Sequence, residues 1–337
     1  MDTINLPVGI KIGSTYACAS VFDGNEQKNV VIKSCIRYVR DPITNDVNET
    51  VVGEDTPDAV FPLDKGIIEK DYNIEPVIAI INKLGIPKFA RVVAAVPAVE
   101  ILNGKERLKQ AIGSALSPRK LVLFPEVFCG AVNALGVMDG ADGKKQLKAL
   151  NSNFLAVNLG STTTEVLISR NGARAYLNAF TKVSGNRVDH MLYDTLQNSM
   201  GKVIITLPKV REIKEKFDLN NPHEIKFNVL TGRGMEEEHL YKPVQDAIYT
   251  YIQEVAELLK SILVHSLDNE MIAQVLDNPV VLTGGMGNIK GLPEQLERKL
   301  REVLNYQDVF VLKQESGHIA PSRGALMLTE YVPWEKI

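Results

Sequence analysis

The sequence contains one pattern twice, and this duplication constrains the fold more than any other feature. Residues 8–21 and residues 155–168 each read as two apolar, β-branched strands joined by a turn of small residues. The first turn is Gly13-Ser14-Thr15 and the second is Gly160-Ser161-Thr162-Thr163. A supersecondary unit that returns in this way predicts a chain with two related halves.

The segments around each copy alternate between strand-like and helix-like patterns. Helices are expected over residues 73–84, 105–116, 187–199, 208–217, 241–266, 292–303 and 322–331, and further strands over residues 30–39, 91–96, 120–124, 279–283 and 309–312. Such alternation indicates an α/β protein with parallel crossovers. Residues 139–152 lack apolar periodicity and are expected to be a connector, and Glu236-Glu237-Glu238 is expected to form a solvated turn.

Composition excludes several classes of protein. The 337 residues are 45% hydrophobic and 23% charged, with a net charge of −3. A near-neutral balance argues against nucleic-acid binding by general electrostatics, so no nucleic-acid partner is expected. The three cysteines are widely spaced, which supports neither a disulfide framework nor a zinc ribbon, and the five histidines lack metal-ligand spacing. We therefore expect no metal centre built from these residues.

The sequence also predicts where the chain resides. No apolar run approaches the roughly 18–20 residues of a membrane span, and Met1 to Pro7 show no basic start followed by an apolar stretch. We expect a cytoplasmic protein with no integral membrane segment. The single tryptophan, Trp334, is expected to pack the last residues against the first domain.

Three glycine-containing turns are candidates for phosphate binding. Besides the two duplicated turns, Gly284-Gly285-Met286-Gly287 follows a buried strand. Phosphate binding needs close backbone approach, N–H donors and hydroxyl groups, and glycine beside serine or threonine at a strand end supplies all three. Ordinary hairpin turns and a helix start would explain each turn taken alone.

The motifs resemble those of a known superfamily. Residues 8–18 resemble the first phosphate loop of actins, seventy-kilodalton heat-shock chaperones and sugar kinases, residues 157–165 resemble the second, and residues 281–286 resemble the adenosine motif. Further segments fall where the bacterial actins MreB and ParM carry comparable ones: residues 62–68, 93–97, 124–126, 184–187 and 232–234. The chain leaves no room for a separate peptide-binding domain, so it looks most like a prokaryotic actin.

This resemblance implies two duplicated actin-like, ribonuclease-H-like domains with a nucleotide cleft between them. The first domain would comprise residues 1–145, with a C-terminal helix in residues 318–337 returning to it, and the second would comprise residues 146–317. The implied ligand is ATP or GTP, and the implied partner is a second copy of the chain. Head-to-tail contacts would then build filaments, with a protein adaptor or cargo as a further partner.

Site residues follow from the same resemblance. Glu126 would orient the attacking water, which makes the chain a candidate ATPase. The nucleotide would be held by three groups of residues. The β-phosphate side comprises Gly13, Ser14, Thr15 and Tyr16, the γ-phosphate side comprises Gly160, Ser161, Thr162 and Thr163, and the nucleoside side comprises Gly185, Asn186, Lys214, Gly284, Gly285 and Met286.

Departures from the family pattern concentrate where a metal would bind. Lys11 and Asn158 stand where the family usually has aspartates that hold a hydrated magnesium ion. Magnesium should therefore bind more weakly or differently here, while the lysine could contact phosphate or replace the cation. Ser161 and Thr162 also replace glycines, and the usual adenosine-side glutamate is shifted or replaced near Arg211. These departures put efficient hydrolysis in question.

Alternatives remain open for individual residues and for the whole chain. Lys11 could be a strand-end lysine with its head in solvent, and Glu126 and Asp189 could be ordinary carboxylates in the first turn of a helix. For the chain, the alternatives are a chaperone-like or reactivase-like nucleotide-binding protein and a scaffold that kept the fold but lost the nucleotide. A sugar kinase is not favoured, because the sequence offers no candidate aspartate base for a sugar hydroxyl.

Overall fold

The computed structural model describes residues 6–23, 26–64, 67–68, 73–99, 104–140, 144–200, 203–221, 227–231, 234–238, 241–333 and 335. Two five-stranded sheets of equal topology organise it. The first has the order β3(Glu26–Lys33), β2(Tyr16–Asp23), β1(Pro7–Ile12), β8(Arg91–Val96) and β9(Lys120–Pro125). The second has the order β14(Ala173–Phe180), β13(Thr164–Arg170), β12(Phe154–Leu159), β18(Val280–Thr283) and β19(Val311–Lys313). We call the parts around them the first and second lobes.

Strand directions repeat as well as strand order. In each lobe the central strand pairs antiparallel with its hairpin partner and parallel with the next strand across the sheet. The two remaining strands extend each sheet in the same sense, one antiparallel and one parallel. The α/β class and the duplication expected from the sequence are therefore confirmed.

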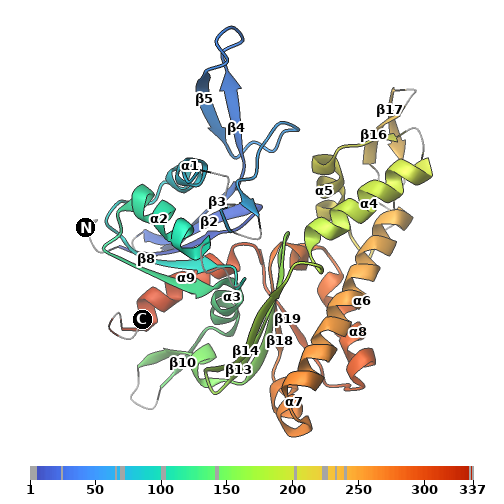
Figure 1. The fold of residues 1–337 in the computed structure, drawn as a ribbon. Helices are drawn as coiled ribbons and strands as arrows, with labels where there is room; N and C mark the ends of the chain where they lie inside the picture. Colours follow the sequence, from blue (N-terminus) through green and yellow to red (C-terminus); the bar gives the residue numbers. More distant parts are fainter. Residues whose placement is uncertain are drawn as a thin grey trace.

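Helices cover both sheets (Figure 1). Those in the first lobe or beside it are α1(Glu75–Lys83), α2(Gly104–Leu116), α3(Glu126–Leu135) and α9(Ala320–Tyr331). Those in the second lobe are α4(Gly185–Met200), α5(Leu207–Lys216), α6(Tyr241–Ser266), α7(Asn269–Leu276) and α8(Leu292–Leu304). Each lobe has its own apolar core. A third buried cluster takes residues from both sheets and from α3 and α9, for example Val93, Val127, Phe154 and Leu328, so it joins the lobes.

Helix α9 is pressed between strand β1 and helix α3. A Cβ on Gly324 would lie 1.7 Å from the carbonyl oxygen of Cys129, and a Cβ on Gly9 would lie 2.1 Å from that of Ser322. These glycines permit backbone-to-backbone packing that no larger residue allows. His318 lies two residues before α9, and its carbonyl accepts a hydrogen bond from Lys11 of β1.

Smaller strands and two short 3-10 helices complete the described structure. A hairpin of β4(Ile36–Arg40) and β5(Val47–Val52) projects from the first lobe at the top of Figure 1. The remaining elements are β6(Leu63–Asp64), β7(Ile67–Ile68), β10(Val137–Asp139), β11(Lys145–Leu147), η2(Lys148–Asn151), β15(Val203–Ile204), β16(Phe227–Thr231), β17(Gly234–Glu238) and η4(Gly285–Asn288).

Two local predictions are wrong, and several lie outside the described residues. The expected connector at residues 139–152 contains a short hairpin, β10 with β11, followed by η2, because three-residue strands leave no periodic signal. Glu236-Glu237-Glu238 belongs to strand β17, not to a turn. Trp334 and parts of the segments 62–68 and 232–234 are not among the described residues. The domain boundaries stay a prediction.

Candidate functional site

A pocket lies between the lobes, where the duplicated turns face each other. It encloses about 670 Å³ of space, counting the part open to solvent. Ligand pockets of this kind are usually about 300–1,000 Å³. Most of the predicted site residues line it, from both lobes: Lys11, Gly13, Ser14, Thr15, Tyr16, Glu126, Asn158, Gly160, Ser161, Thr162, Thr163, Lys214, Gly285 and Met286.

The two turns are closed and joined to each other. The amide of Gly13 donates to the carbonyl of Tyr16 at 3.2 Å, and the amide of Gly160 donates to that of Thr163 at 2.9 Å. The hydroxyl oxygens of Ser14 and Thr162 lie 2.9 Å apart, in hydrogen-bond contact across the two lobes. Both turns therefore present hydroxyl groups to the same space.

Three predicted residues lie outside the pocket lining, and two of them support the second turn. The amide of Gly185 donates to the carbonyl of Gly160 at 3.0 Å, and that of Asn186 donates to Ser161 at 2.6 Å. The third, Gly284, has φ +93°, and a Cβ there would lie 2.4 Å from the carbonyl oxygen of Leu159. These residues position the turn that borders the pocket.

Four buried polar side chains form what we call the cleft floor: Lys11 on β1, Glu126 at the start of α3, Asn158 on β12 and Glu165 on β13. The ammonium of Lys11 lies 3.5 Å from Glu126 Oε2, and Asn158 Nδ2 donates to the same oxygen at 3.1 Å. Glu165 pairs across the strands with Asn158 and accepts from the amide of Val127 at 3.2 Å. The four residues are at most 7% exposed.

Burial governs the charges of the cleft floor. Desolvation, together with the charge of Glu126, raises the pKa of Glu165 to about 8, so this carboxyl is mainly protonated at neutral pH. Burial by itself would lower the pKa of Lys11 and is the largest single influence, but the neighbouring Glu126, Cys18 and Glu165 together outweigh it, so the pKa is raised. Lys11 therefore stays charged and balances Glu126.

The structure shows the surroundings of the three residues whose roles the sequence left open. Lys11 does not hold its head in solvent: its ammonium contacts Glu126 and donates to the carbonyl of His318 at 3.4 Å. Glu126 is the first residue of α3, as the helix-start reading has it, and it also lines the pocket. Asp189 is buried, lines the pocket, and lies 2.6 Å from the ammonium of Lys214.

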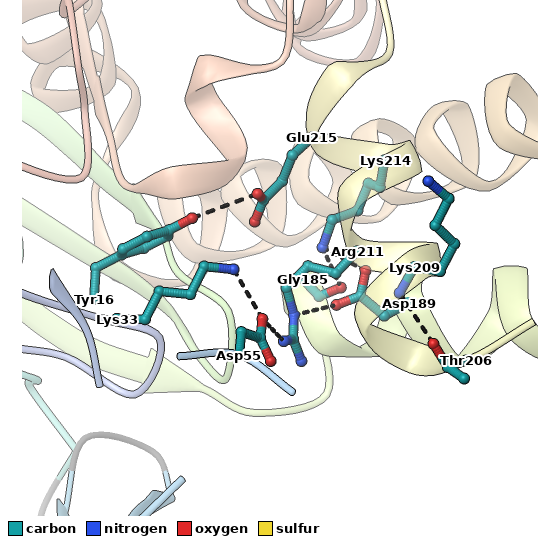
Figure 2. A network of polar contacts seen from close by, with 10 residues as sticks. All are labelled: Tyr16, Lys33, Asp55, Gly185, Asp189, Thr206, Lys209, Arg211, Lys214 and Glu215. Atoms are coloured by element: carbon teal, nitrogen blue, oxygen red, sulfur yellow. Dashed lines mark hydrogen bonds and ion pairs between the residues drawn. The ribbon is translucent and has the colours of Figure 1, made fainter. Parts of the chain in front are cut away.

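A second polar network borders the pocket and joins the lobes, as Figure 2 shows. We call Tyr16, Lys33, Asp55, Arg211 and Glu215 the interlobe clasp. Asp55 Oδ2 of the first lobe lies 2.8 Å from the ammonium of Lys33 and 3.1 Å from the guanidinium of Arg211 on α5. The Tyr16 hydroxyl donates to Glu215 Oε2 at 3.4 Å. Charges on one lobe are thus paired with charges on the other.

Sequence reasoning missed several residues of the site. Glu165 lies directly before the apolar run Val166-Leu167-Ile168 and opposite Asn158, and its place beside that run was the available signal. His318 lines the pocket and its ring lies 5.3 Å from that of Tyr16, although no motif marks it. Burial, helped by the charges of Lys11 and Arg323, lowers the pKa of His318 to about 4, so it is neutral at pH 7.

Within the described ranges, no group of three or more histidine, cysteine, aspartate or glutamate side chains is arranged to hold a metal ion. In that same part of the chain, no helix combines the length and the apolar character needed to cross a membrane.

The duplicated sheets with a pocket between them are a prokaryotic actin-like fold, and two solved structures share it. The MamK double helical filament matches with a TM-score of 0.79 and 22% identity, covering 98% of this chain and 100% of that one. MreB5 of Spiroplasma citri bound to ADP matches with a TM-score of 0.75 and 15% identity, covering 97% of each chain. Both likenesses show the fold.

A narrower assignment comes from the sequence family. The family described as Salactin matches residues 5–332, so the chain belongs to the salactin family. Salactin of Halobacterium salinarum is 27% identical over 339 residues, covering 96% of this chain and 91% of that protein. The resemblance to prokaryotic actins drawn from the motifs is therefore confirmed.

Proposed function

We propose that this chain binds a nucleoside triphosphate, ATP or GTP, between its lobes and polymerises into cytoskeletal filaments. The observation that carries the proposal is the convergence of both hydroxyl-rich turns on one pocket, with Ser14 and Thr162 in contact across it. Backbone amides, hydroxyls and a buried ammonium are the groups that recognise phosphate. MamK as a double helical filament and MreB5 bound to ADP support the same reading through a shared fold.

Each part of the pocket has a proposed role. The turn at residues 13–15 contacts the β-phosphate, the turn at residues 160–163 contacts the γ-phosphate, and Gly285 and Met286 border the base. Lys214 reaches the ribose, and Glu126 orients a water for attack on the γ-phosphate. We further propose that residues 1–145 with 318–337 form one actin-like domain and residues 146–317 the other.

The proposed assembly follows from these roles. A nucleotide held by both lobes fixes their relative orientation, because each lobe supplies one phosphate-binding turn. A fixed orientation lets the surface of one copy meet a different surface of the next, and such heterologous contacts build an open filament. Hydrolysis would remove contacts to the second turn and so loosen the filament.

High-speed sedimentation with and without ATP or GTP, followed by negative-stain imaging of the pellet, tests the proposal. Filaments are expected with a nucleotide. A protein that stays in the supernatant under every nucleotide and salt condition would contradict polymerisation.

Two glycine variants make this experiment specific to the pocket. Gly13→Ala should lose nucleotide-dependent sedimentation, because its Cβ would lie 3.0 Å from Lys11 Cε and 3.1 Å from the carbonyl of Tyr16. Gly113→Ala on α2 is the matched control, because a Cβ there meets nothing within 4 Å. Equal sedimentation of the two variants would argue against a role for the first turn.

A nucleotide-free scaffold is a second candidate function. It is favoured by the pairing of charges across the lobes in the interlobe clasp, which joins the lobes through the chain's own side chains. Titration calorimetry with ATP and GTP separates the two, because heat of binding to either nucleotide would exclude the scaffold.

A further inference from the structure

The ammonium of Lys11 lies directly beneath the first phosphate-binding turn. A Cβ added to Gly13 would lie 3.0 Å from Lys11 Cε and 3.4 Å from Lys11 Nζ, so the lysine head fills the space under the glycine. The same residue lines the pocket, together with both turns. A positive charge that belongs to the chain therefore lies in the part of the pocket where the phosphates of the proposed nucleotide would bind.

The hydrogen bond and the ion pair of the Lys11 ammonium are long enough for it to turn toward a ligand. An ammonium has three N–H donors. Among the described residues, Lys11 makes two polar contacts, at 3.4 Å to the carbonyl of His318 and at 3.5 Å to Glu126 Oε2. Both are longer than a strong charge-assisted hydrogen bond, which is about 2.7–2.9 Å. Lys11 can therefore exchange the contact with the His318 carbonyl for a phosphate oxygen while its charge stays close to Glu126.

Glu126 is suited to that exchange. Its Oε1 is buried and has no hydrogen-bond partner within the described part of the chain. Its Oε2 keeps the bond from Asn158 Nδ2 at 3.1 Å whether or not Lys11 stays beside it. The carboxylate therefore remains supported on one side while Lys11 moves.

The donor set does not fit the magnesium ion that the fold family implies. Magnesium is bound through carboxylates, phosphates and water. In this pocket β1 offers an ammonium and β12 an amide. Of the three lining carboxylates, Glu215 is exposed, and the two buried ones, Glu126 and Asp189, are each paired with a lysine. A divalent cation would be repelled by Lys11 and would have to displace it from Glu126.

We propose that Lys11 takes the place of a divalent cation, so that this chain binds its nucleotide without a metal. The inference rests on the proposed function, since it concerns the same pocket. Lys11 then supplies a tethered charge to the phosphates, and the affinity for nucleotide is set by the chain alone.

Calorimetric titration of ATP and of GTP into the full chain, in EDTA and in magnesium chloride, tests this inference. The affinity of the wild type should differ by less than about threefold between the two buffers. Lys11→Asp supplies a carboxylate and should bind nucleotide only in magnesium. Wild-type binding that is lost in EDTA would overturn the inference and leave the proposed function standing. Absence of binding in both buffers would overturn the proposed function itself.

A double variant that removes both charges of the cleft floor avoids leaving one buried charge without its partner, which could prevent folding. Lys11→Met combined with Glu126→Gln removes both charges together, and its nucleotide affinity should fall roughly ten- to a hundredfold in both buffers. Lys242→Met is the control, because Lys242 is exposed on α6 and pairs with Asp246, and neither residue lines the pocket. An unchanged affinity in the double variant, with intact thermal unfolding, would contradict a role for the lysine.

Discussion

The cleft floor and the interlobe clasp both place charged groups where the two lobes meet, but water reaches them differently. In the cleft floor the side chains of Lys11 and Glu126 are 9% and 5% exposed, and their charged atoms lie 3.5 Å apart. In the interlobe clasp Lys33 is 28% exposed, and Asp55 accepts contacts at 2.8 Å and 3.1 Å from two cations. The shorter contacts are thus found where solvent is nearer.

This difference separates two roles for ion pairs. A buried charge that loses its partner keeps its full desolvation penalty, whereas a partly exposed charge can be rehydrated and is screened by salt. The cleft floor should therefore respond strongly to loss of one charge and little to salt. The interlobe clasp should respond weakly to loss of one contact and measurably to salt. Five variants can break or sharpen this contrast.

Lys11→Met should give the largest effect on stability. It leaves Glu126 buried without its cation, and breaking a buried pair in this way costs about 3–5 kcal/mol of unfolding free energy. Urea denaturation at neutral pH measures the change. The Lys11→Met/Glu126→Gln double variant should recover most of the loss, and the surface control Lys242→Met should lie within about 0.5 kcal/mol of the wild type. A loss that persists in the double variant would mean that packing of the lysine stem, not charge, is what matters.

Glu126→Gln tests chemistry at the same place. If the chain hydrolyses its nucleotide, loss of the carboxylate should lower phosphate release by about a hundredfold or more, because the water loses its oriented base. Nucleotide affinity should be retained, since Lys11 remains. Phosphate release and titration calorimetry on the same preparation separate these effects, with an unfolding curve to show that the variant is folded. Equal turnover in variant and wild type would remove Glu126 from the proposed mechanism.

Glu165→Gln should change how stability depends on pH. The pKa of Glu165 is raised to about 8 in the folded chain, so between its ordinary value of 4.5 and 8 the folded state keeps a proton that the unfolded chain loses. Its contribution to stability is therefore present at low pH and is lost as the pH rises through that window. Denaturation of both proteins across the window should show a shallower decline for the variant. Parallel profiles would show that Glu165 is ionised in the folded chain.

The cleft floor was largely predictable, because most of its residues lie in or next to strands of the duplicated sequence pattern. Lys11 and Asn158 are the next-to-last residues of the equivalent strands β1 and β12, and Glu126 directly follows strand β9. Glu165 was not predicted as a site residue, because its position beside Asn158 becomes clear only when the pairing of the two strands is known. Motif spacing therefore identifies site residues along the chain, whereas identifying a neighbour on the next strand requires the register of the sheet.

The interlobe clasp could not be predicted in the same way. Asp55 follows a short hairpin in an irregular segment, and its partner Arg211 lies 156 residues further along. Polar side chains in loops leave no periodic signal, so no pattern links them. Strand β14, which has no buried residue, and helix α7, which is only eight residues long, were also not predicted, because neither has an extended apolar pattern. Helix α6, which carries a long buried apolar stripe, was predicted to the residue.

Asp55→Asn should have a moderate effect, smaller than any change of charge in the cleft floor. It weakens two charge-assisted contacts, to Lys33 and to Arg211, and should lower stability by about 1–2 kcal/mol. Added salt should narrow the gap between wild type and variant, because the wild-type pairs are partly exposed. Urea denaturation at low and high ionic strength measures both. A salt-independent loss would place this network with the cleft floor.

Tyr16→Phe should have the smallest effect. It removes one exposed 3.4 Å hydrogen bond to Glu215 and leaves the ring contact with His318 in place, so the loss of stability should stay under about 1 kcal/mol. Because the ring stays, nucleotide affinity should change less than in Tyr16→Ala, which removes the pocket-lining ring as well. Denaturation and calorimetric titration of both variants make the comparison. If Tyr16→Phe alone released the lobes, seen as a larger radius in small-angle scattering, the single bond to Glu215 would outweigh the charged pairs beside it, and the ranking of contacts by burial and charge would fail.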